Sequence, residues 1–265
     1  MKDHVLGFIG CGHMGMAIAR GVCKSGFLTP EKICVYDPNE AINRTCHQEG
    51  YQTCTDEKDV CNRAHIVLLA TRPQDSDEVL DKMKGTDIEV LLSIVTGYSI
   101  RYLQEKLGKI PVIRAMPNTP LLVNKGSTVI CRSDDCDSKD YEYVKEMFSC
   151  LGLCKDISED KINAMVCVNG SIPAYVYYLT ECILEDMKQR GFKEEDIKDL
   201  LIETVIGSGY LMKESDKPLS VLIDQVCSKG GTTIEAITEM RNRNMNRIIA
   251  DANTKCINRA EELGR

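Results

Sequence analysis

The sequence predicts an α/β protein with two domains. Residues 1–157 are expected to form a doubly wound parallel sheet, and residues 158–265 an all-helical domain. Three observations predict this fold. Short apolar runs alternate with helical patterns in the first part, a glycine-rich turn follows the first run, and helical patterns alone fill the second part. Strands and helices that alternate with right-handed crossovers build a sheet covered on both faces, and ligands bind beyond the carboxyl ends of its strands.

The strands of the first part are expected at short, nearly continuous runs rich in Val, Ile and Leu, which are typical of strands buried on both faces. The expected strands are Val5–Ile9, Lys32–Tyr36, Ile66–Ala70, Glu89–Ser93, Val112–Met116 and Ser127–Cys131. The expected helices of this part are Met14–Ser25, Asn39–Glu49, Gln74–Met83, Ile100–Leu107 and Lys139–Leu151.

The second part is expected to be helical throughout. The expected helices are Glu159–Val168, Ala174–Arg190, Glu194–Lys213, Leu219–Cys227, Thr232–Arg243 and Asn244–Leu263. Pro173 suits the first turn of the second of these helices, and Gly191 suits its end. A helical domain this small with broad apolar faces is expected to bury them against a second copy of the chain, which predicts a homodimer.

A glycine-rich turn joins the first strand to the first helix, with the sequence Gly10-Cys11-Gly12-His13-Met14-Gly15. In this G-x-G-x-x-G pattern Gly10 permits the tight turn, Gly12 lets a pyrophosphate approach the backbone, and Gly15 lets the helix pack close to the strand. The N-terminus of the helix then offers free N–H groups and a partial positive charge to phosphate. The pattern predicts a Rossmann-like dinucleotide site, and an ordinary strand–helix turn is the alternative.

Asp37 closes the second apolar run, at the place where a carboxylate that binds ribose hydroxyls is expected. Such a carboxylate would repel a 2′-phosphate, and no Lys or Arg lies between Asp37 and Glu40, the nearest being Arg44. These residues favour NAD(H) over NADP(H). In the alternative interpretation Asp37 is only a turn or N-cap residue before Pro38.

Two other strand ends carry unusual residues. The third run ends in Ala70-Thr71-Arg72-Pro73, where Pro73 can be the first helical residue and Arg72 can equally be a solvated loop charge. The run Val112–Met116 leads into Pro117-Asn118-Thr119-Pro120. Two prolines around Asn-Thr make a rigid loop where a cofactor or substrate is expected.

A second glycine-containing turn lies between two helices of the second part, with the sequence Ser228-Lys229-Gly230-Gly231-Thr232-Thr233. The glycine pair permits backbone conformations that leave N–H groups exposed, and Thr232 and Thr233 can cap the next helix. A helix N-terminus with free amides and hydroxyls can bind a carboxylate. An ordinary Gly-Gly turn with a Thr cap is the alternative.

Composition excludes several classes of function. The net charge of −7 argues against nonspecific nucleic-acid binding, and no apolar run is long enough for a transmembrane helix. Because the first expected strand begins at Val5, no signal peptide is expected before it. Fourteen cysteines without C-x-x-C spacing predict buried, reduced thiols in a cytoplasmic protein and no metal site.

Together these motifs resemble those of the pyrroline-5-carboxylate reductase family. The resemblance spans nearly the whole chain, in order, through the segments Gly10–Gly15, Ala70–Pro73, Met116–Pro120, Gly170–Tyr175 and Ser228–Thr233. Three positions depart from the family pattern, because Arg72 replaces Lys, Ile172 replaces Gly and Lys229 replaces Pro. The last two lie in segments that bear on the substrate rather than on the cofactor.

The resemblance implies that the chain reduces the C=N bond of the cyclic imine carboxylate Δ1-pyrroline-5-carboxylate to L-proline with NAD(P)H. It implies that Thr233 places its hydroxyl near the ring nitrogen as the catalytic group. The implied substrate-binding residues are Ser228, Gly230, Gly231, Thr232 and Asn118. The cofactor-binding residues expected from the motifs and the resemblance are Gly10, Cys11, Gly12, His13, Met14, Gly15, Asp37, Ala70, Thr71, Arg72, Pro73 and Met116.

The resemblance also implies an interlocked dimer, often assembled further into a decamer. Its active site would lie between the sheet domain of one subunit and the helical domain of its partner.

Two alternatives remain open from the sequence. A β-hydroxyacid-type dehydrogenase has the same two-domain plan, but it needs an acid, usually a Lys on the first long helix of the second domain, and no Lys occurs from Ile162 to Met187. A non-catalytic or divergent dinucleotide-binding paralogue is supported only by Ile172 and Lys229. A substrate with a six-membered ring is also compatible with the sequence.

Overall fold

The computed structural model describes residues 2–264, which divide into two compact units. The first unit contains the chain up to Pro173 together with the segment from Cys256 onward, and the second contains Ala174–Lys255. The predicted domain boundary after residue 157 differs from this division, because residues 158–173 pack with the sheet.

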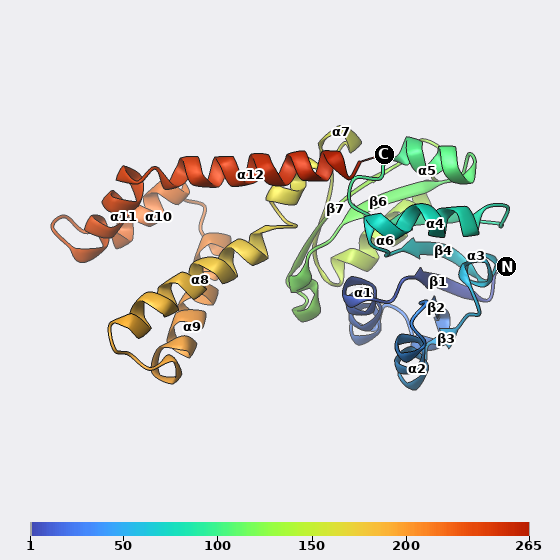
Figure 1. The fold of residues 1–265 in the computed structure, drawn as a ribbon, viewed down its shortest axis with the longest axis horizontal. Coiled ribbons are helices and arrows are strands. Elements are labelled where there is room, and N and C mark those ends of the chain that lie inside the picture. Colours follow the sequence, from blue (N-terminus) through green and yellow to red (C-terminus); the bar gives the residue numbers. More distant parts are fainter. Residues whose placement is uncertain (1, 265) are drawn as a thin grey trace. The chain divides into compact units, whose positions relative to one another are not determined.

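One sheet of eight strands forms the centre of the first unit, with helices on both faces (Figure 1). The strand order is β3-β2-β1-β4-β5-β6-β7-β8. The strands are β1 His4–Ile9, β2 Ile33–Tyr36, β3 Gln52–Thr53, β4 Ala64–Leu69, β5 Val90–Ser93, β6 Val112–Met116, β7 Gly126–Arg132 and β8 Gly152–Asp156.

The helices that cover the sheet come from the segments between the strands. They are α1 His13–Lys24, α2 Glu40–Gln48, α3 Glu57–Arg63, α4 Pro73–Met83, α5 Ile100–Leu107, α6 Ser138–Ser149 and α7 Glu159–Ile162. Alternate residues of the strands face two separate cores. Phe8 packs with Ile18 of α1 in one core, and Val67 packs with Leu80 of α4 in the other. The predicted doubly wound α/β fold is confirmed.

The sheet differs from the prediction at its edges. The pair β6–β7 is antiparallel rather than parallel. Residues 117–125 connect the two strands, and a segment of this length is too short for the crossover that parallel neighbours need. The sequence interpretation also missed β3, α3 and β8, which are short or rich in polar residues and therefore lack an apolar run.

The segment 158–173 is held to the sheet by an ion pair between a buried arginine and a partly exposed glutamate. Arg114 on β6 is 4% exposed, and its Nη1 donates to Oε1 of Glu159 at 3.0 Å. The same carboxylate oxygen accepts from the backbone N–H of Ile100 at 2.6 Å. The predicted helix over 159–168 is divided into α7 and a 3₁₀ turn, Ala164–Cys167.

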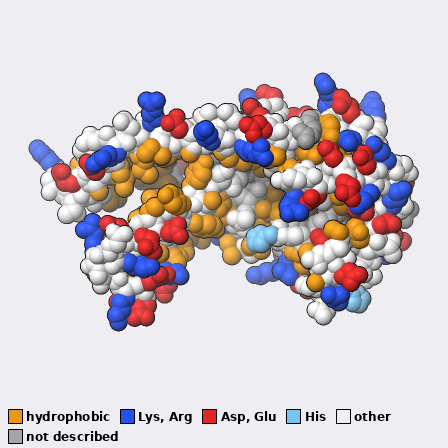
Figure 2. Space-filling model, viewed as in Figure 1, with side chains coloured by type: hydrophobic (Ala, Val, Ile, Leu, Met, Phe, Trp, Pro, Cys, Tyr) orange, Lys and Arg blue, Asp and Glu red, His pale blue; other side chains and the backbone are white. Residues whose placement is uncertain are grey.

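The second unit consists of helices only, as the sequence predicts. They are α8 Ile172–Gln189, α9 Glu194–Glu214, α10 Leu219–Val226, α11 Thr232–Asn242 and α12 Met245–Glu262, with the ends of α8 and α12 assigned to the first unit. Within the described residues, α8 to α11 contain no buried side chain. Many apolar side chains lie exposed on these helices (Figure 2), among them Tyr178, Leu200, Leu211 and Val226. Across the described part of the chain, no helix has the length and apolarity needed to span a membrane.

Candidate functional site

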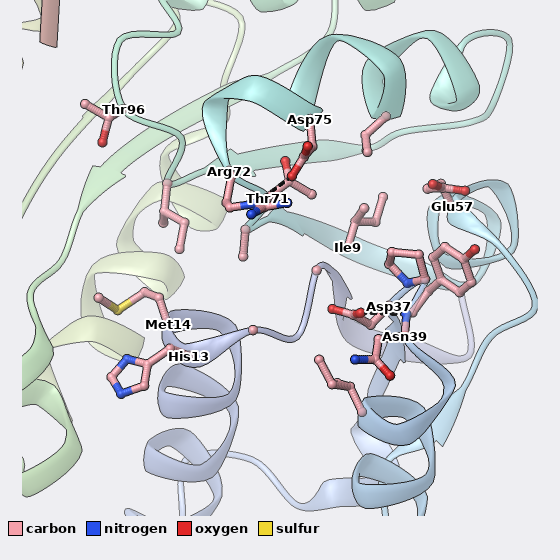
Figure 3. Close-up of a pocket in the computed structure, with 18 of the residues that line it drawn as sticks. Ile9, His13, Met14, Asp37, Asn39, Glu57, Thr71, Arg72, Asp75 and Thr96 are labelled. Carbon is pink, nitrogen blue, oxygen red and sulfur yellow. Dashed lines mark hydrogen bonds and ion pairs between the residues drawn. The ribbon is translucent and has the colours of Figure 1, made fainter. Parts of the chain in front are cut away.

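A cleft of about 1120 Å³ opens at the carboxyl ends of β1, β2, β4 and β6 in the first unit. Of the residues predicted to bind a cofactor, nine line it: Gly10, Gly12, His13, Met14, Asp37, Ala70, Thr71, Arg72 and Met116. Figure 3 shows Asp37 and Asn39 on one side of the glycine-rich turn and His13 and Met14 on the other. Cys11, Gly15 and Pro73 do not line the cleft.

The glycine-rich turn leaves the N-terminus of α1 open. Gly10 has a φ of +89°, and a Cβ there would lie 2.8 Å from the carbonyl oxygen of Ala70. A Cβ on Gly15 would lie 2.5 Å from the carbonyl oxygen of Gly10, whereas a Cβ on Gly12 would have no atom within 4 Å. Gly12 is the N-cap of α1, no side chain caps the helix, and its first turn contains no acidic residue. The arrangement therefore offers uncapped N–H groups to an anion.

Asp37 joins the end of β2 to the glycine-rich turn. Its side chain accepts hydrogen bonds from the backbone N–H of Cys11 at 2.8 Å and from that of Asn39 at 2.9 Å. The N-cap of α2 is Asn39, which accepts from Ala41 N at 3.0 Å, so Asp37 makes a turn but is not the cap. A carboxylate can accept further hydrogen bonds beyond these two, so the position still suits ribose hydroxyls. The Cys11 thiol is buried in the core.

The end of β4 supplies the opposite wall of the cleft. The hydroxyl groups of Thr71 and Ser76 lie 2.7 Å apart, and Nε of Arg72 donates to Oδ2 of Asp75 at 2.8 Å. The Arg72 side chain is 82% exposed, which matches a solvated loop charge as well as a cofactor contact. Pro73 is the first residue of α4, and its carbonyl oxygen accepts from the Tyr98 hydroxyl.

The loop after β6 is fixed by two buried asparagines. Asn118 accepts from Ser127 N at 2.8 Å and donates to the carbonyl oxygen of Asn169 at 3.1 Å. Asn169 in turn donates to the carbonyl oxygen of Met116 at 2.5 Å. Asn118 does not line the cleft, and its role as a substrate ligand stays a prediction. Sequence reasoning missed Asn169, whose only signal is the Asn-Gly break before α8.

The turn Ser228–Thr233 lies in the second unit, between α10 and α11. Gly230 has a φ of +73°, and Gly231 donates its N–H to the carbonyl oxygen of Ser228 at 2.9 Å. The N-cap of α11 is Gly231, and no side chain caps the helix. The expected caps from Thr232 and Thr233 are therefore wrong. The first amides of α11 have no side-chain cap, which is the property a carboxylate site needs.

Four charged residues of the cleft belong to no motif that the sequence could have revealed: Glu57, Asp75, Glu78 and Lys82. Lys82 lies within 4 Å of the carboxylates of Glu57 and Glu78. Among the described residues, no group of three or more His, Cys, Asp or Glu side chains could hold a metal ion.

Comparison with known proteins matches both halves of the chain to family models. The model for pyrroline-5-carboxylate reductase dimerisation matches residues 159–263. The model described as NADP oxidoreductase, coenzyme F420-dependent, matches residues 5–97.

Individual relatives match over nearly the full length. The pyrroline-5-carboxylate reductase of Escherichia coli is 33% identical over 98% of both chains, and that of Corynebacterium melassecola is 31% identical over 97% of both. Among solved structures, a pyrroline carboxylate reductase of Plasmodium falciparum with NADP bound covers both chains completely, with 27% identity and a TM-score of 0.91. A reductase of the same kind from Coxiella burnetii gives 29% identity and a TM-score of 0.87.

Proposed function

This chain belongs to the pyrroline-5-carboxylate reductase family, and from that membership we propose that it reduces the C=N bond of Δ1-pyrroline-5-carboxylate to L-proline with a nicotinamide cofactor. The observation that carries the proposal is identity of 33% with such a reductase over 98% of both chains. The family-specific segments from Met116 to Pro120 and from Gly230 to Thr233 are intact in this sequence.

The cleft fits a dinucleotide. A pyrophosphate has a partner in the uncapped N-terminus of α1, where Gly12 leaves open space and the first turn of the helix contains no acidic residue. Asp37 is held at the edge of the same turn, in reach of a ribose. When bound, a reduced nicotinamide supplies the hydride for the reaction. Met116, fixed through Asn169, lines the cleft beside His13 and Met14 and would flank the nicotinamide.

The second unit supplies the proposed substrate site. The uncapped amides at the start of α11 and the hydroxyl groups of Ser228 and Thr232 would bind the carboxylate. Thr233 would lie against the ring nitrogen and relay one proton. A cyclic imine is readily protonated, and its iminium form accepts hydride well, so the protein mainly has to orient the imine carbon. A strong general base is not required.

The charge of Asp37 supports NADH over NADPH as the preferred cofactor. A 2′-phosphate carries about −1.5 to −2 charges and would approach a buried carboxylate. The loop after β2 contains no cation before Arg44, and Arg44 lies 3.5 Å from Glu40. A ratio of kcat/KM that strongly favours NADPH would refute this use of Asp37.

The assembly that we propose is a homodimer formed by residues 158–265, built further into a decamer. The exposed apolar side chains of α8 to α11 support a dimer, because monomers rarely expose so much apolar surface. We further propose a cytoplasmic location, because the described cysteines are free thiols, and most of them are buried.

One assay tests the proposed reaction and its alternatives. Purified protein should oxidise NADH in the presence of Δ1-pyrroline-5-carboxylate. If the substrate site accepts a larger ring, it should also oxidise NADH with the six-membered cyclic imine carboxylate. Reverse assays with 3-hydroxy acids should show no activity. Turnover of 3-hydroxy acids would instead favour a β-hydroxyacid-type dehydrogenase. Tight NADH binding without turnover of either imine would point to a non-catalytic paralogue.

A further inference from the structure

A cation in the cleft is enclosed by carboxylates. Nζ of Lys82 on α4 lies 3.6 Å from Oε1 of Glu57 and 2.8 Å from Oε1 of Glu78, and all three residues line the cleft. Glu57 begins α3 and is only 5% exposed, whereas Glu78 is exposed. Figure 3 shows Glu57 on the same side of the glycine-rich turn as Asp37. Lys82 is therefore already paired at the end of the cleft where a ribose is expected.

The charged groups of this part of the cleft all act on Tyr36, the last residue of β2. Burial raises the pKa of the Tyr36 hydroxyl, the negative charges of Glu57 and Asp37 raise it further, and the positive charge of Lys82 opposes them. The carboxylates of Glu57 and Asp37 and the ammonium group of Lys82 thus all act electrostatically on the end of β2.

The balance of charge in the described cleft is negative. Four carboxylates line it, from Asp37, Glu57, Asp75 and Glu78, against the two cations Arg72 and Lys82. Each cation is paired, since Arg72 donates to Asp75 and Lys82 lies between Glu57 and Glu78. A bound group with additional negative charge would find no unpaired cation in this lining.

We propose that Glu57, supported by Glu78, determines cofactor choice by keeping Lys82 neutralised, so that the cleft disfavours a dinucleotide with a 2′-phosphate. The proposal rests on the proposed function only in taking this cleft as the dinucleotide site. To use Lys82, a 2′-phosphate would have to draw it from Glu57 and leave a buried carboxylate unpaired, which is costly. A 2′-hydroxyl group makes no such demand. Lys82 could therefore bind a 2′-phosphate only after its ion pair with Glu57 is broken.

The test is direct titration of NADH and NADPH binding by fluorescence, without substrate. Glu57→Gln keeps the shape of the side chain and removes its charge, so the Kd for NADPH should fall about tenfold while the Kd for NADH changes less than about twofold. Glu78→Gln removes an exposed charge and should lower the Kd for NADPH about twofold. Adding Lys82→Met to Glu57→Gln should abolish the gain in affinity for NADPH.

Asp81→Asn is the matched control. Asp81 lies on α4, the helix of Glu78 and Lys82, and pairs with Lys84 at 2.6 Å, but neither Asp81 nor Lys84 lines the cleft. It removes the same charge from α4 and should leave the ratio of the two Kd values unchanged. An unchanged ratio in Glu57→Gln, or an equal change in Asp81→Asn, would overturn the proposal. Should Glu57→Gln not fold, the ratio of the Kd values for NADPH and NADH in the exposed Glu78→Gln variant tests the proposal instead.

These outcomes are separate from those of the proposed function. Wild-type protein that binds NADH but turns over no cyclic imine would refute the reaction, and the Kd ratios of the variants would still decide the role of Glu57. Wild-type protein that turns over the imine, with Kd ratios that Glu57→Gln does not alter, would leave the reaction standing and remove Glu57 from cofactor choice.

Discussion

Gly12 and Gly15 belong to the same turn, but a methyl group would meet different surroundings at the two positions. At Gly12 it would extend into open space at the N-terminus of α1. At Gly15 it would lie 2.5 Å from the carbonyl oxygen of Gly10, a backbone atom that cannot move aside easily. The first glycine thus keeps space for a ligand, and the second permits a close contact within the fold.

Gly12→Ala should therefore weaken cofactor binding and spare stability. We expect the Kd for NADH to rise about tenfold or more, because the methyl group occupies the approach of the pyrophosphate. The melting temperature should stay within a few degrees of wild type. Gly15→Ala should instead lower the free energy of unfolding by about 1–3 kcal/mol. Calorimetric titration and urea denaturation measure the two quantities, and the reverse assignment of effects would contradict this account.

Thr233 is the residue whose hydroxyl the proposed chemistry needs. Thr233→Ala should lower kcat well over tenfold, because no other group of the turn then lies against the ring nitrogen. The Kd for NADH should be unchanged, since the cleft of the first unit does not include Thr233. Thr233→Ser retains the hydroxyl and should recover much of the activity. Thr254→Ala, which removes a hydroxyl bonded to Ala250 within α12, is the control. Unchanged turnover in Thr233→Ala would remove its catalytic role.

At the scale of elements, the loop between β6 and β7 makes backbone hydrogen bonds of its own, and the Asn118 side chain ties it to β7 and to Asn169. Asn118→Ala should lower the free energy of unfolding by about 1–3 kcal/mol, because Ser127 N–H and the carbonyl group of Asn169 lose a buried partner. The loss is measured by urea denaturation. Asn118 also carries an implied substrate role, so KM for the imine should be measured beside it. Wild-type stability with a raised KM would show that Asn118 binds substrate and does not tie the loop.

His65 links three elements and makes the fold sensitive to pH. Nδ1 lies 2.5 Å from Oε2 of Glu89, beside β5, and Nε2 lies 2.7 Å from Oδ1 of Asp140 on α6. Burial lowers the pKa of His65, but the hydrogen bonds to Asp140 and Glu89 outweigh it and raise the pKa above the ordinary value of 6.5. The charged imidazolium is therefore favoured in the folded state.

A raised folded-state pKa contributes stability that is fully present below pH 6.5 and is lost as the pH rises through the folded-state value. The difference in free energy of unfolding between wild type and His65→Gln should thus be largest at acid pH and shrink towards alkaline pH. Urea denaturation at several pH values between about 5 and 9 measures it. A difference that grows with pH would mean that His65 is not held as the cation.

How far the sequence predicts these elements depends on the strength of their patterns. The run Val112–Met116 is buried at every residue, and its predicted bounds are those of β6. The strand β8 has the sequence Gly-Leu-Cys-Lys-Asp and is stabilised by pairing with β7, a long-range contact that no local pattern reveals. The same limit applies to the site. Gly10–Gly15 form a local motif, whereas Glu57 and Lys82 approach each other only because α3 and α4 pack on one face of the sheet.

At the scale of the molecule, the two units differ in how they bury apolar side chains. The first unit has a core on each face of its sheet, whereas Leu200 and Leu211 on α9 are 70% and 69% exposed. These two leucines are separated by about three helical turns and therefore face the same side of α9. Exposed apolar residues in register on one helix face are the pattern of a subunit interface.

Replacing both leucines, as Leu200→Lys with Leu211→Lys, should break the assembly. Two desolvated ammonium groups in an apolar interface oppose association strongly, so light scattering should give the mass of one chain, 29.6 kDa. Asp199→Lys, which places a lysine at an exposed position of the same helix without replacing an apolar side chain, is the control and should keep the wild-type mass. The Kd for NADH should change less than about twofold, because every residue that lines the cleft lies in the first unit. Imine turnover should fall well over tenfold if the partner subunit supplies the turn Ser228–Thr233. A monomeric variant with full turnover would contradict the shared active site and place the whole reaction within one chain.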